Sequence, residues 1–221
     1  MTKKIIMGLS HWRWPRFFIL MKDMEIIKAT DNSVINPNIT HLYIYGDRRE
    51  KFTNLRKALA SAKPKRSIVF VNDEVSIEVI NEKLNYHKYK SVCISGKMSK
   101  EARKNAMTAF RSGKANILVS SDLSARGLDI PDVSHVFNLD FPLSKNEYLH
   151  RCGRSARGNK KGTAISIVTN QNLGTIRDYK RQFKINMKAV EIKEGKFVDV
   201  DFAKLKKEAK AKREFKNKIN S

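Results

Sequence analysis

The sequence predicts an α/β fold built on a doubly wound parallel sheet, followed by a basic C-terminal tail. Short runs of β-branched and aromatic residues alternate with polar–apolar helical stretches through the middle of the chain. The runs are apolar throughout, which is typical of strands covered by helices on both faces of a sheet. With 221 residues, of which 41% are hydrophobic, the chain can form one sizeable domain and an extension but not two full α/β domains.

The expected strands and helices follow one another along the chain. Strands are expected at His41–Tyr45, Ser67–Val71, Lys90–Ile94, Asn116–Ser120, Val133–Leu139 and Thr163–Val168. Helices are expected at Asp47–Ala60, Glu74–Asn85, Lys100–Ser112 and Ser144–Arg151. Ser144 and Glu147 have the spacing of a capping box, which marks a helix start. In such a sheet, ligands usually bind in the loops at the C-terminal ends of the strands.

The charge of the chain points to a polyanionic partner. Lys and Arg number 45 against 22 Asp and Glu, which gives a formal net charge of +23. This excess attracts nucleic acid or a nucleoprotein particle, although a merely soluble or ribosome-associated basic protein would share it. The two cysteines, Cys93 and Cys152, are too few for a zinc site and are expected to be reduced thiols in the cytosol.

The two ends of the chain differ from the expected domain. Residues 1–38 are expected to form an atypical N-terminal segment and linker, residues 39–190 the domain, and residues 191–221 a basic tail that is partly helical or disordered. The apolar stretch Trp12–Met21 is too short for a transmembrane helix and lacks a signal-peptide cleavage site. It is expected to pack on a neighbouring surface or to stack on bases. The tail is a solubilising charge run, a non-specific clamp for RNA, or both.

The first candidate functional segment is Ser120–Pro131, directly after an expected strand. Gly127 permits a positive φ or a close backbone approach. Asp122 and Asp129 bring carboxylates to the same loop, where a carboxylate can accept hydrogen bonds from sugar hydroxyls. From the residues alone, a tight turn with polar caps is an equal interpretation.

The second segment is His150–Arg157, where Arg151, Arg154 and Arg157 recur at every third residue and share a broad face. Clustered guanidiniums repel one another unless an anion lies between them, and each can bind phosphate oxygens bidentately. Surface ion pairing is the alternative, but few acidic residues lie nearby in sequence, so anion binding is favoured. His150 has no nucleophile to pair with and is expected to be a hydrogen-bonding structural residue.

The third segment is Ser95–Arg103, which links an expected strand to an expected helix. Its small residues and Lys97 suit contact with a backbone phosphate near a helix N-terminus. The first N–H groups of a helix and its dipole favour anions there. By itself this pattern does not specify a ligand.

Taken together, these segments resemble the C-terminal domain of DEAD-box RNA helicases. The resemblance rests on SIVFVN, SGKMSKEAR with AFRSG, LVSSDLSARGLDIPDVSHVFNLDFP, and YLHRCGRSARGNKKG with TAISIV, in that order and at the family's spacing. It spans roughly Ile39 to Thr169. It implies a RecA-like fold and a role as the second half of a helicase that binds RNA and ATP.

The resemblance also implies roles for individual residues. Asp129 would contact the ATP ribose, and Arg154 and Arg157 would reach the γ-phosphate, with Arg157 as the arginine finger. His150 and Arg151 would couple this domain to a partner domain. The residues implied to contact the RNA backbone are Gly96, Arg103, Ser121 and Gly127.

The chain departs from the family pattern at several positions. Lys100 stands where a Gln is expected, Ala156 where the arginine motif usually has Gly, and Ser95 where His is common. Asp73 and Glu74 follow the Ser67–Val71 strand at positions where basic residues often stand, which affects one expected RNA contact.

The chain contains no G-x-x-x-x-G-K-[ST] phosphate loop and no Asp-Glu-Ala-Asp box. In the family, these elements cradle ATP and hold Mg²⁺. ATP and Mg²⁺ are therefore expected to bind to this chain together with a separate N-terminal RecA-like domain. The chain alone is not expected to hydrolyse ATP. The expected function is therefore the C-terminal half of an ATP-dependent RNA helicase, with a non-catalytic RNA-binding or annealing module as the alternative. A cytoplasmic location, no metal or membrane binding by the chain itself, and a role in ribosome biogenesis complete the expectations.

Overall fold

The structure is a computed structural model that describes residues 35–128, 130, 133–156 and 160–201. All of these belong to one of the two units into which the chain divides, the unit that begins at Val34. Asp129 and Arg157, which have predicted roles in ATP binding, lie outside the described residues. So do the stretch Trp12–Met21 and the tail from residue 202 onward.

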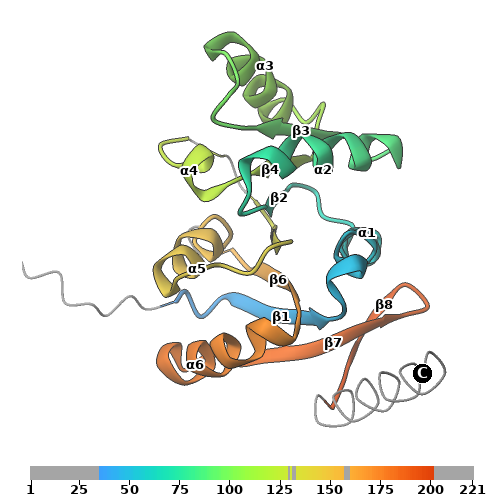
Figure 1. The fold of residues 1–221 in the computed structure, drawn as a ribbon, viewed down its shortest axis with the longest axis vertical. Coiled ribbons are helices and arrows are strands. Elements are labelled where there is room, and N and C mark those ends of the chain that lie inside the picture. Colours follow the sequence, from blue (N-terminus) through green and yellow to red (C-terminus); the bar gives the residue numbers. More distant parts are fainter. Residues whose placement is uncertain (1–34, 129, 131–132, 157–159, 202–221) are drawn as a thin grey trace, which may run out of the picture. The chain divides into compact units, whose positions relative to one another are not determined.

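The strands of the described residues form one sheet in the order β3-β4-β2-β5-β6-β1-β7-β8 (Figure 1). All paired neighbours are parallel except β7 and β8, which are antiparallel. The strands are β1 Ile39–Tyr45, β2 Ser67–Phe70, β3 Ser91–Ile94, β4 Ile117–Ser120, β5 His135–Asn138, β6 Gly162–Val168, β7 Met187–Lys193 and β8 Lys196–Asp199. The central strands are short and buried on both faces, as their continuous apolar runs predict.

Helices connect the parallel strands. They are α1 Lys51–Ala62, α2 Glu74–Tyr86, α3 Lys100–Arg111, α4 Asp122–Ala125, α5 Lys145–Cys152 and α6 Leu173–Phe183, with short 3-10 turns at Arg48–Glu50 and Asn170–Asn172. In the part of the chain that the structure describes, no helix has the length and apolar character needed to cross a membrane.

The helices cover both faces of the sheet. Side chains of α1 and α2 share one apolar cluster with Val69 of β2. Ile68 and Phe70, the neighbours of Val69 along the strand, belong to a different cluster with α3 and α4. Because successive residues of a strand point to opposite faces, these two clusters lie on opposite sides of the sheet. A third cluster joins α5 and α6 to β1 and β6. The predicted doubly wound architecture is confirmed.

The capping box predicted at the start of α5 is also confirmed. The Ser144 hydroxyl accepts a hydrogen bond from the backbone N–H of Glu147 at 3.2 Å, and the Glu147 carboxylate accepts one from the backbone N–H of Ser144 at 3.3 Å. The same carboxylate accepts a bond from the N–H of Leu143 at 2.8 Å. These bonds fix the position at which the chain, after leaving β5, begins α5.

The end of the sheet differs from the sequence-based expectation. The predicted domain limit at residue 190 falls inside β7, and β8 lies in the segment expected to be a tail. β7 is amphipathic, with Met187 and Val190 buried and charged residues between and after them. Charged residues and partial exposure hide such an edge hairpin from a search for continuous apolar runs.

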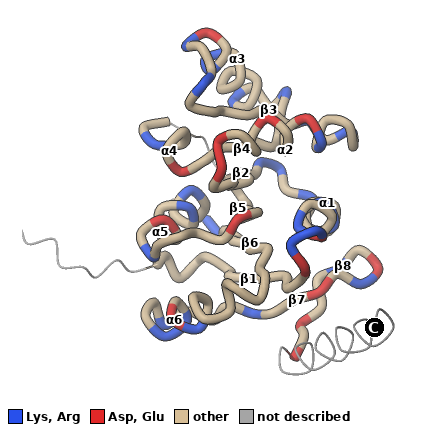
Figure 2. Tube along the Cα trace, in the orientation of Figure 1, with Lys and Arg blue, Asp and Glu red and all other residues tan. Residues whose placement is uncertain are grey.

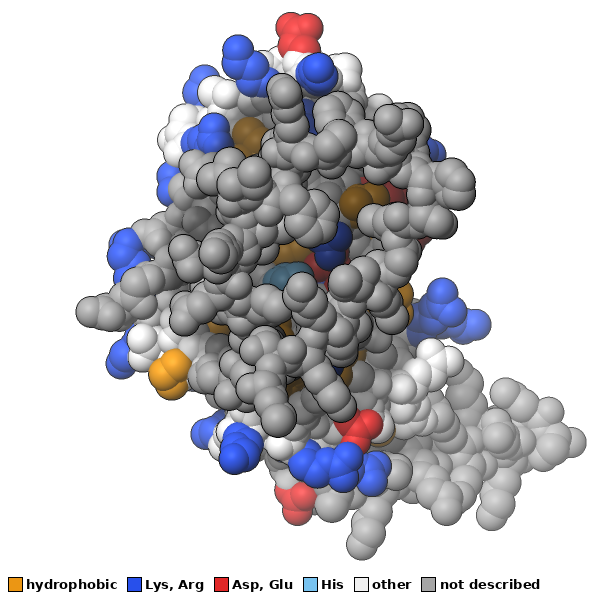
Figure 3. All heavy atoms as spheres, turned by 90° about the vertical axis from the view of Figure 1, so that its left-hand side faces the viewer, with side chains coloured by type: hydrophobic (Ala, Val, Ile, Leu, Met, Phe, Trp, Pro, Cys, Tyr) orange, Lys and Arg blue, Asp and Glu red, His pale blue; other side chains and the backbone are white. Residues whose placement is uncertain are grey.

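Basic residues are spread over the surface of the described unit. Figure 2 shows Lys and Arg on α1, α3, α5 and α6, with acidic residues between them. In the face shown in Figure 3, Lys and Arg side chains likewise appear on several parts of the described surface. The net positive charge is therefore not confined to one helix, and the location of a binding site has to come from local geometry.

Candidate functional site

The C-terminal ends of three neighbouring strands bring two of the predicted RNA-contact segments together. β3, β4 and β2 are adjacent in the sheet, and the loops that follow them begin at Ser95, Ser121 and Val71. Because the strands are parallel, these loops lie at the same edge of the sheet. Gly96 and Ser121, which were assigned to RNA from separate segments, contact the same side chain at this edge.

That side chain is Glu74, the first residue of α2. Its Oε2 accepts a hydrogen bond from the backbone N–H of Gly96 at 2.7 Å, and its Oε1 accepts one from the Ser124 hydroxyl at 2.8 Å. The Ser121 hydroxyl also donates to Oε1. We call these three donors, the N–H of Gly96 and the hydroxyls of Ser121 and Ser124, the donor cradle. All three point at the oxygen atoms of one anion.

The surroundings of Glu74 favour its ionised form. Partial burial would raise the pKa of its carboxyl, but the hydrogen bonds from the donor cradle and the charge of Arg103 outweigh burial and lower the pKa. Arg103 is itself half-buried, and its Nη2 donates to the carbonyl oxygen of Ser95 at 3.1 Å. This edge of the sheet is therefore arranged to hold a negative charge.

The loop after β4 is shaped by a helix cap and a glycine. The Ser121 hydroxyl oxygen caps α4 by accepting a hydrogen bond from the backbone N–H of Ser124 at 3.1 Å. Gly127 has a φ of +71°, which confirms one of the two expectations for this residue. An L-residue adopts this left-handed conformation only with strain, even though a Cβ would meet nothing within 4 Å.

Arg151 is turned into the domain, and its implied role in coupling to a partner domain stays a prediction. Its side chain is 1% exposed. Its Nε donates to Asp122 Oδ1 at 3.0 Å, and its Nη2 donates to Asp122 Oδ2 at 2.5 Å. A guanidinium that is enclosed and bound bidentately in this way cannot reach a second domain unless the network opens.

Further partners make Arg151 the centre of a buried network. Its Nη2 donates to Asn72 Oδ1, and its Nη1 to the carbonyl oxygen of Asp140, both at 2.7 Å. Its guanidinium also lies 5.0 Å from the centre of the Phe70 ring. Arg151 therefore ties α5 to the ends of β2 and β5 and to the loop after β4. We call these contacts the Arg151 network.

The Arg151 network also corrects two interpretations based on spacing. The spacing of Arg151, Arg154 and Arg157 favours a shared anion-binding face, but Arg151 is paired with Asp122, which lies 29 residues away in sequence. Asp122 in turn binds a cation, whereas its loop position left a sugar hydroxyl and a polar turn cap as equal interpretations. Residues that are close in sequence do not reveal an ion pair between two distant segments.

Two other residues of the arginine segment lie closer to the surface. His150 is exposed and Arg154 is half-buried. Both line one small hollow together with Asp122 and Arg126. The structure thus brings His150 and Arg154 together. The described residues do not include Asp129 or Arg157, so the roles of Asp129, Arg154 and Arg157 in binding ATP stay predictions.

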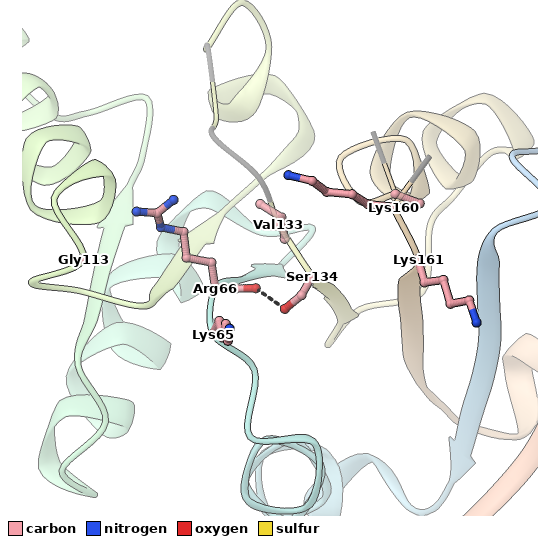
Figure 4. Close-up of a pocket in the computed structure, with 8 residues that line it drawn as sticks. Lys65, Arg66, Gly113, Val133, Ser134, Lys160 and Lys161 are labelled. Atoms are coloured by element: carbon pink, nitrogen blue, oxygen red, sulfur yellow. Dashed lines mark hydrogen bonds between the residues drawn. The ribbon is translucent and has the colours of Figure 1, made fainter. Parts of the chain in front are cut away.

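A basic pocket lies at the opposite end of the central strands. Its volume is about 560 Å³. Figure 4 shows the side chain of Lys160 extending toward Val133, while the Ser134 hydroxyl donates to the Arg66 carbonyl oxygen at 3.0 Å. Its lining residues are Lys65, Arg66, Gly113, Val133, Ser134, Ala156, Lys160 and Lys161. Sequence reasoning missed this pocket, although pairs of basic residues just before β2 and β6 were a visible signal.

The turn that borders this pocket has an unusual backbone. Ala156 is buried and has a φ of +55°, so the position where the family usually has Gly is indeed left-handed. Its carbonyl oxygen accepts a hydrogen bond from Asn36 Nδ2 at 2.7 Å. Gly162 packs against this turn so closely that a Cβ there would lie 2.9 Å from the Ala156 nitrogen and 2.6 Å from Ser155 Oγ.

Comparison with protein families matches residues 50–159 to the helicase conserved C-terminal domain. The DEAD-box ATP-dependent RNA helicase CshC of Bacillus cereus is 36% identical over 176 residues, which cover 80% of this chain and 44% of the relative. The chain thus spans less than half the length of this relative.

Solved structures of DEAD-box proteins are also similar. The E. coli DEAD-box protein SrmB, solved bound to regulator of ribonuclease activity A, is 37% identical with a TM-score of 0.66. That match covers 72% of this chain and 94% of the SrmB chain. S. cerevisiae Dbp5 bound to RNA and ADP BeF3 is 30% identical with a TM-score of 0.66, and the match covers 72% of this chain and 43% of Dbp5.

Proposed function

Because this chain belongs to the DEAD-box RNA helicases and carries their C-terminal domain, we propose that it acts as the second half of an ATP-dependent RNA helicase. In this role it grips the sugar-phosphate backbone of RNA and completes an ATP site shared with an N-terminal RecA-like domain. The observation that carries the proposal is the donor cradle, where Gly96, Ser121 and Ser124 converge on the oxygens of one anion.

Phosphate is the ligand that such a site would hold in RNA. A phosphate group offers the same kind of charged oxygen acceptor as the Glu74 carboxylate, and the charge of Arg103, which already favours the ionised form of Glu74, would favour the phosphate too. Binding through the backbone carries little sequence information, so a weak sequence preference is expected. Gly127, exposed in the same loop, would contribute a main-chain contact.

The ATP side of the proposal rests on the arginine segment. We assign Arg157 as the arginine finger, Arg154 as a second γ-phosphate contact and Asp129 as the ribose contact, with His150 facing the partner domain. A finger of this kind stabilises charge in the transition state and contributes about 10³–10⁵ in rate. Mg²⁺ would be held by the partner domain, which supplies the phosphate loop and acidic box. We propose the cytoplasm as the location of this activity.

The assignment of Arg157 is tested by complementation. The chain is mixed with an N-terminal RecA-like domain of a DEAD-box relative, and ATP hydrolysis is measured with and without single-stranded RNA. RNA-stimulated hydrolysis is expected, and Arg157→Ala should lower it at least about a thousandfold. Arg181→Ala is the matched control, because Arg181 lies on α6 with its side chain 84% exposed and, among the described residues, forms its ion pair with Asp178. Undiminished hydrolysis by Arg157→Ala would refute the finger assignment.

A second candidate function, a non-catalytic RNA-binding or annealing module, is favoured by the basic pocket and the net charge of +23. In that case RNA affinity would fall steeply with salt, with a slope of about −0.7 per neutralised phosphate on single strands. Affinity would also be indifferent to nucleotide and to Arg157→Ala. Deletion of Lys204–Ser221 would reduce the salt slope if the tail is a clamp.

A further inference from the structure

We propose that Glu74 is an internal competitor for RNA: its carboxylate occupies the donor cradle, and an RNA phosphate has to displace it. The inference rests on the proposed function, because it assumes that the donor cradle is where RNA phosphate binds. It adds a restraint built into the RNA-binding edge of this chain. The chain would thus carry an acidic group at the site where an anionic ligand binds.

The competition follows from the hydrogen bonds. The Gly96 N–H and the hydroxyls of Ser121 and Ser124 all donate to Glu74. A backbone N–H or a hydroxyl has a single hydrogen to donate, so a phosphate oxygen can be bound only after the carboxylate leaves. Two anions at one site would also repel each other, and Arg103 cannot fully neutralise both.

The position of Glu74 is set by the start of α2. The Asp73 carboxylate caps this helix by accepting hydrogen bonds from the Val75 N–H at 3.2 Å and the Ser76 hydroxyl at 2.7 Å. Glu74 follows in the first turn, where the helix dipole favours a negative charge. The capped start of α2 therefore places the Glu74 carboxylate within hydrogen-bonding distance of the donor cradle.

An RNA phosphate can nevertheless displace the Glu74 carboxylate. Its side chain is only half-buried, and Gly96 beside it is exposed. A change of side-chain rotamer would carry the carboxylate into solvent, whereas α2 would remain in place on its buried residues Ile77 and Leu84. Because the pKa of Glu74 is lowered, the group stays ionised throughout the neutral range, and a shift of pH near 7 would not lift the competition.

The inference is tested by RNA binding of the full chain. Fluorescence anisotropy with a labelled single-stranded oligouridylate, at fixed salt, is compared for the wild type, Glu74→Gln and Glu82→Gln. Both substitutions remove one negative charge from α2, but Glu82 is exposed and does not contact the donor cradle. We expect Glu74→Gln to bind about tenfold more tightly, and Glu82→Gln to stay within about twofold of the wild type.

The outcomes separate this inference from the proposed function. If all three proteins bind the RNA with the same affinity, the donor cradle is not blocked by Glu74 and the inference fails, while RNA binding stands. If none of them binds even at low salt, the proposed function itself fails. Glu74→Ala provides a second variant, because it empties the donor cradle without placing an amide there. The same gain is expected, and its absence in a folded protein would likewise overturn the inference.

Discussion

Two carboxylates of this domain, Glu74 and Asp122, each accept several hydrogen bonds, yet their surroundings give them different roles. Asp122 is bound by a charged side chain that is 1% exposed, and that side chain makes further contacts across the fold. Glu74 is half-buried and is bound by neutral donors, of which Gly96 is exposed and Ser121 and Ser124 are buried. A carboxylate paired with a buried cation holds the structure together, because neither charge can be left alone. A half-buried carboxylate held by neutral donors can be exchanged for another anion, because its departure leaves no buried charge unpaired.

The largest stability effect is expected in the Arg151 network. Arg151→Met keeps most of the side-chain volume but removes the bonds to Asp122, Asn72 and the Asp140 carbonyl. Loss of one member of such a buried network costs about 3–5 kcal/mol, which denaturant unfolding measures directly. Arg181→Met removes an exposed pair with Asp178 and should stay within about 0.5 kcal/mol. Equal effects of the two substitutions would show that the Arg151 network is not structural.

A smaller stability effect is expected at Glu74. Glu74→Gln should cost about 1 kcal/mol, because it replaces charge-assisted hydrogen bonds with weaker neutral ones while its amide oxygen can still accept from the same donors. The pKa of Glu74 is lowered in the folded state, so its contribution is present above the usual value of 4.5 and is lost as pH falls through the lowered value. The stability difference between the wild type and Glu74→Gln should therefore be constant near pH 7 and shrink in acid. A difference that grows in acid would contradict this picture.

The smallest effect concerns the turn after α5, which follows directly on the Arg151 network. Ala156→Gly relieves a left-handed conformation with a φ of +55° but gives up a buried methyl group. The two effects oppose each other, and a net stabilisation of about 1 kcal/mol or less is expected from thermal unfolding. A clear loss of stability would mean that packing of the methyl group outweighs backbone strain.

Local patterns in the sequence predicted much of the fold. Continuous apolar runs located β2 and β4 because both faces of these strands are covered, and the spacing of Ser144 and Glu147 located the start of α5. β8 was not predictable in this way, because an edge strand pairs on one side and keeps charged side chains in solvent.

The candidate site was only partly predictable, because its key contacts join distant segments. Gly96 and Ser121 were assigned to the same ligand, but nothing in either segment indicated that Glu74 lies between them. The spacing of Arg151 favoured anion binding, and the loop position of Asp122 left a sugar contact or a polar turn cap open, yet the two side chains bind each other. The sequence shows which loops carry charged residues, but not which groups these residues contact. Which opposite charge or donor they meet depends on the order of the strands in the sheet.

The most direct test of this account is to follow the Gly96 amide by ¹⁵N–¹H NMR while single-stranded RNA is added to Glu74→Gln. The Gly174 amide on α6, where a Cβ would meet nothing within 4 Å, is the reference. We predict that the Gly96 resonance shifts as RNA is added and reaches a plateau, because an RNA phosphate accepts the hydrogen bond of this amide. The Gly174 resonance is expected to stay in place. Saturable RNA binding that leaves Gly96 unshifted would contradict a phosphate site at this edge of the sheet.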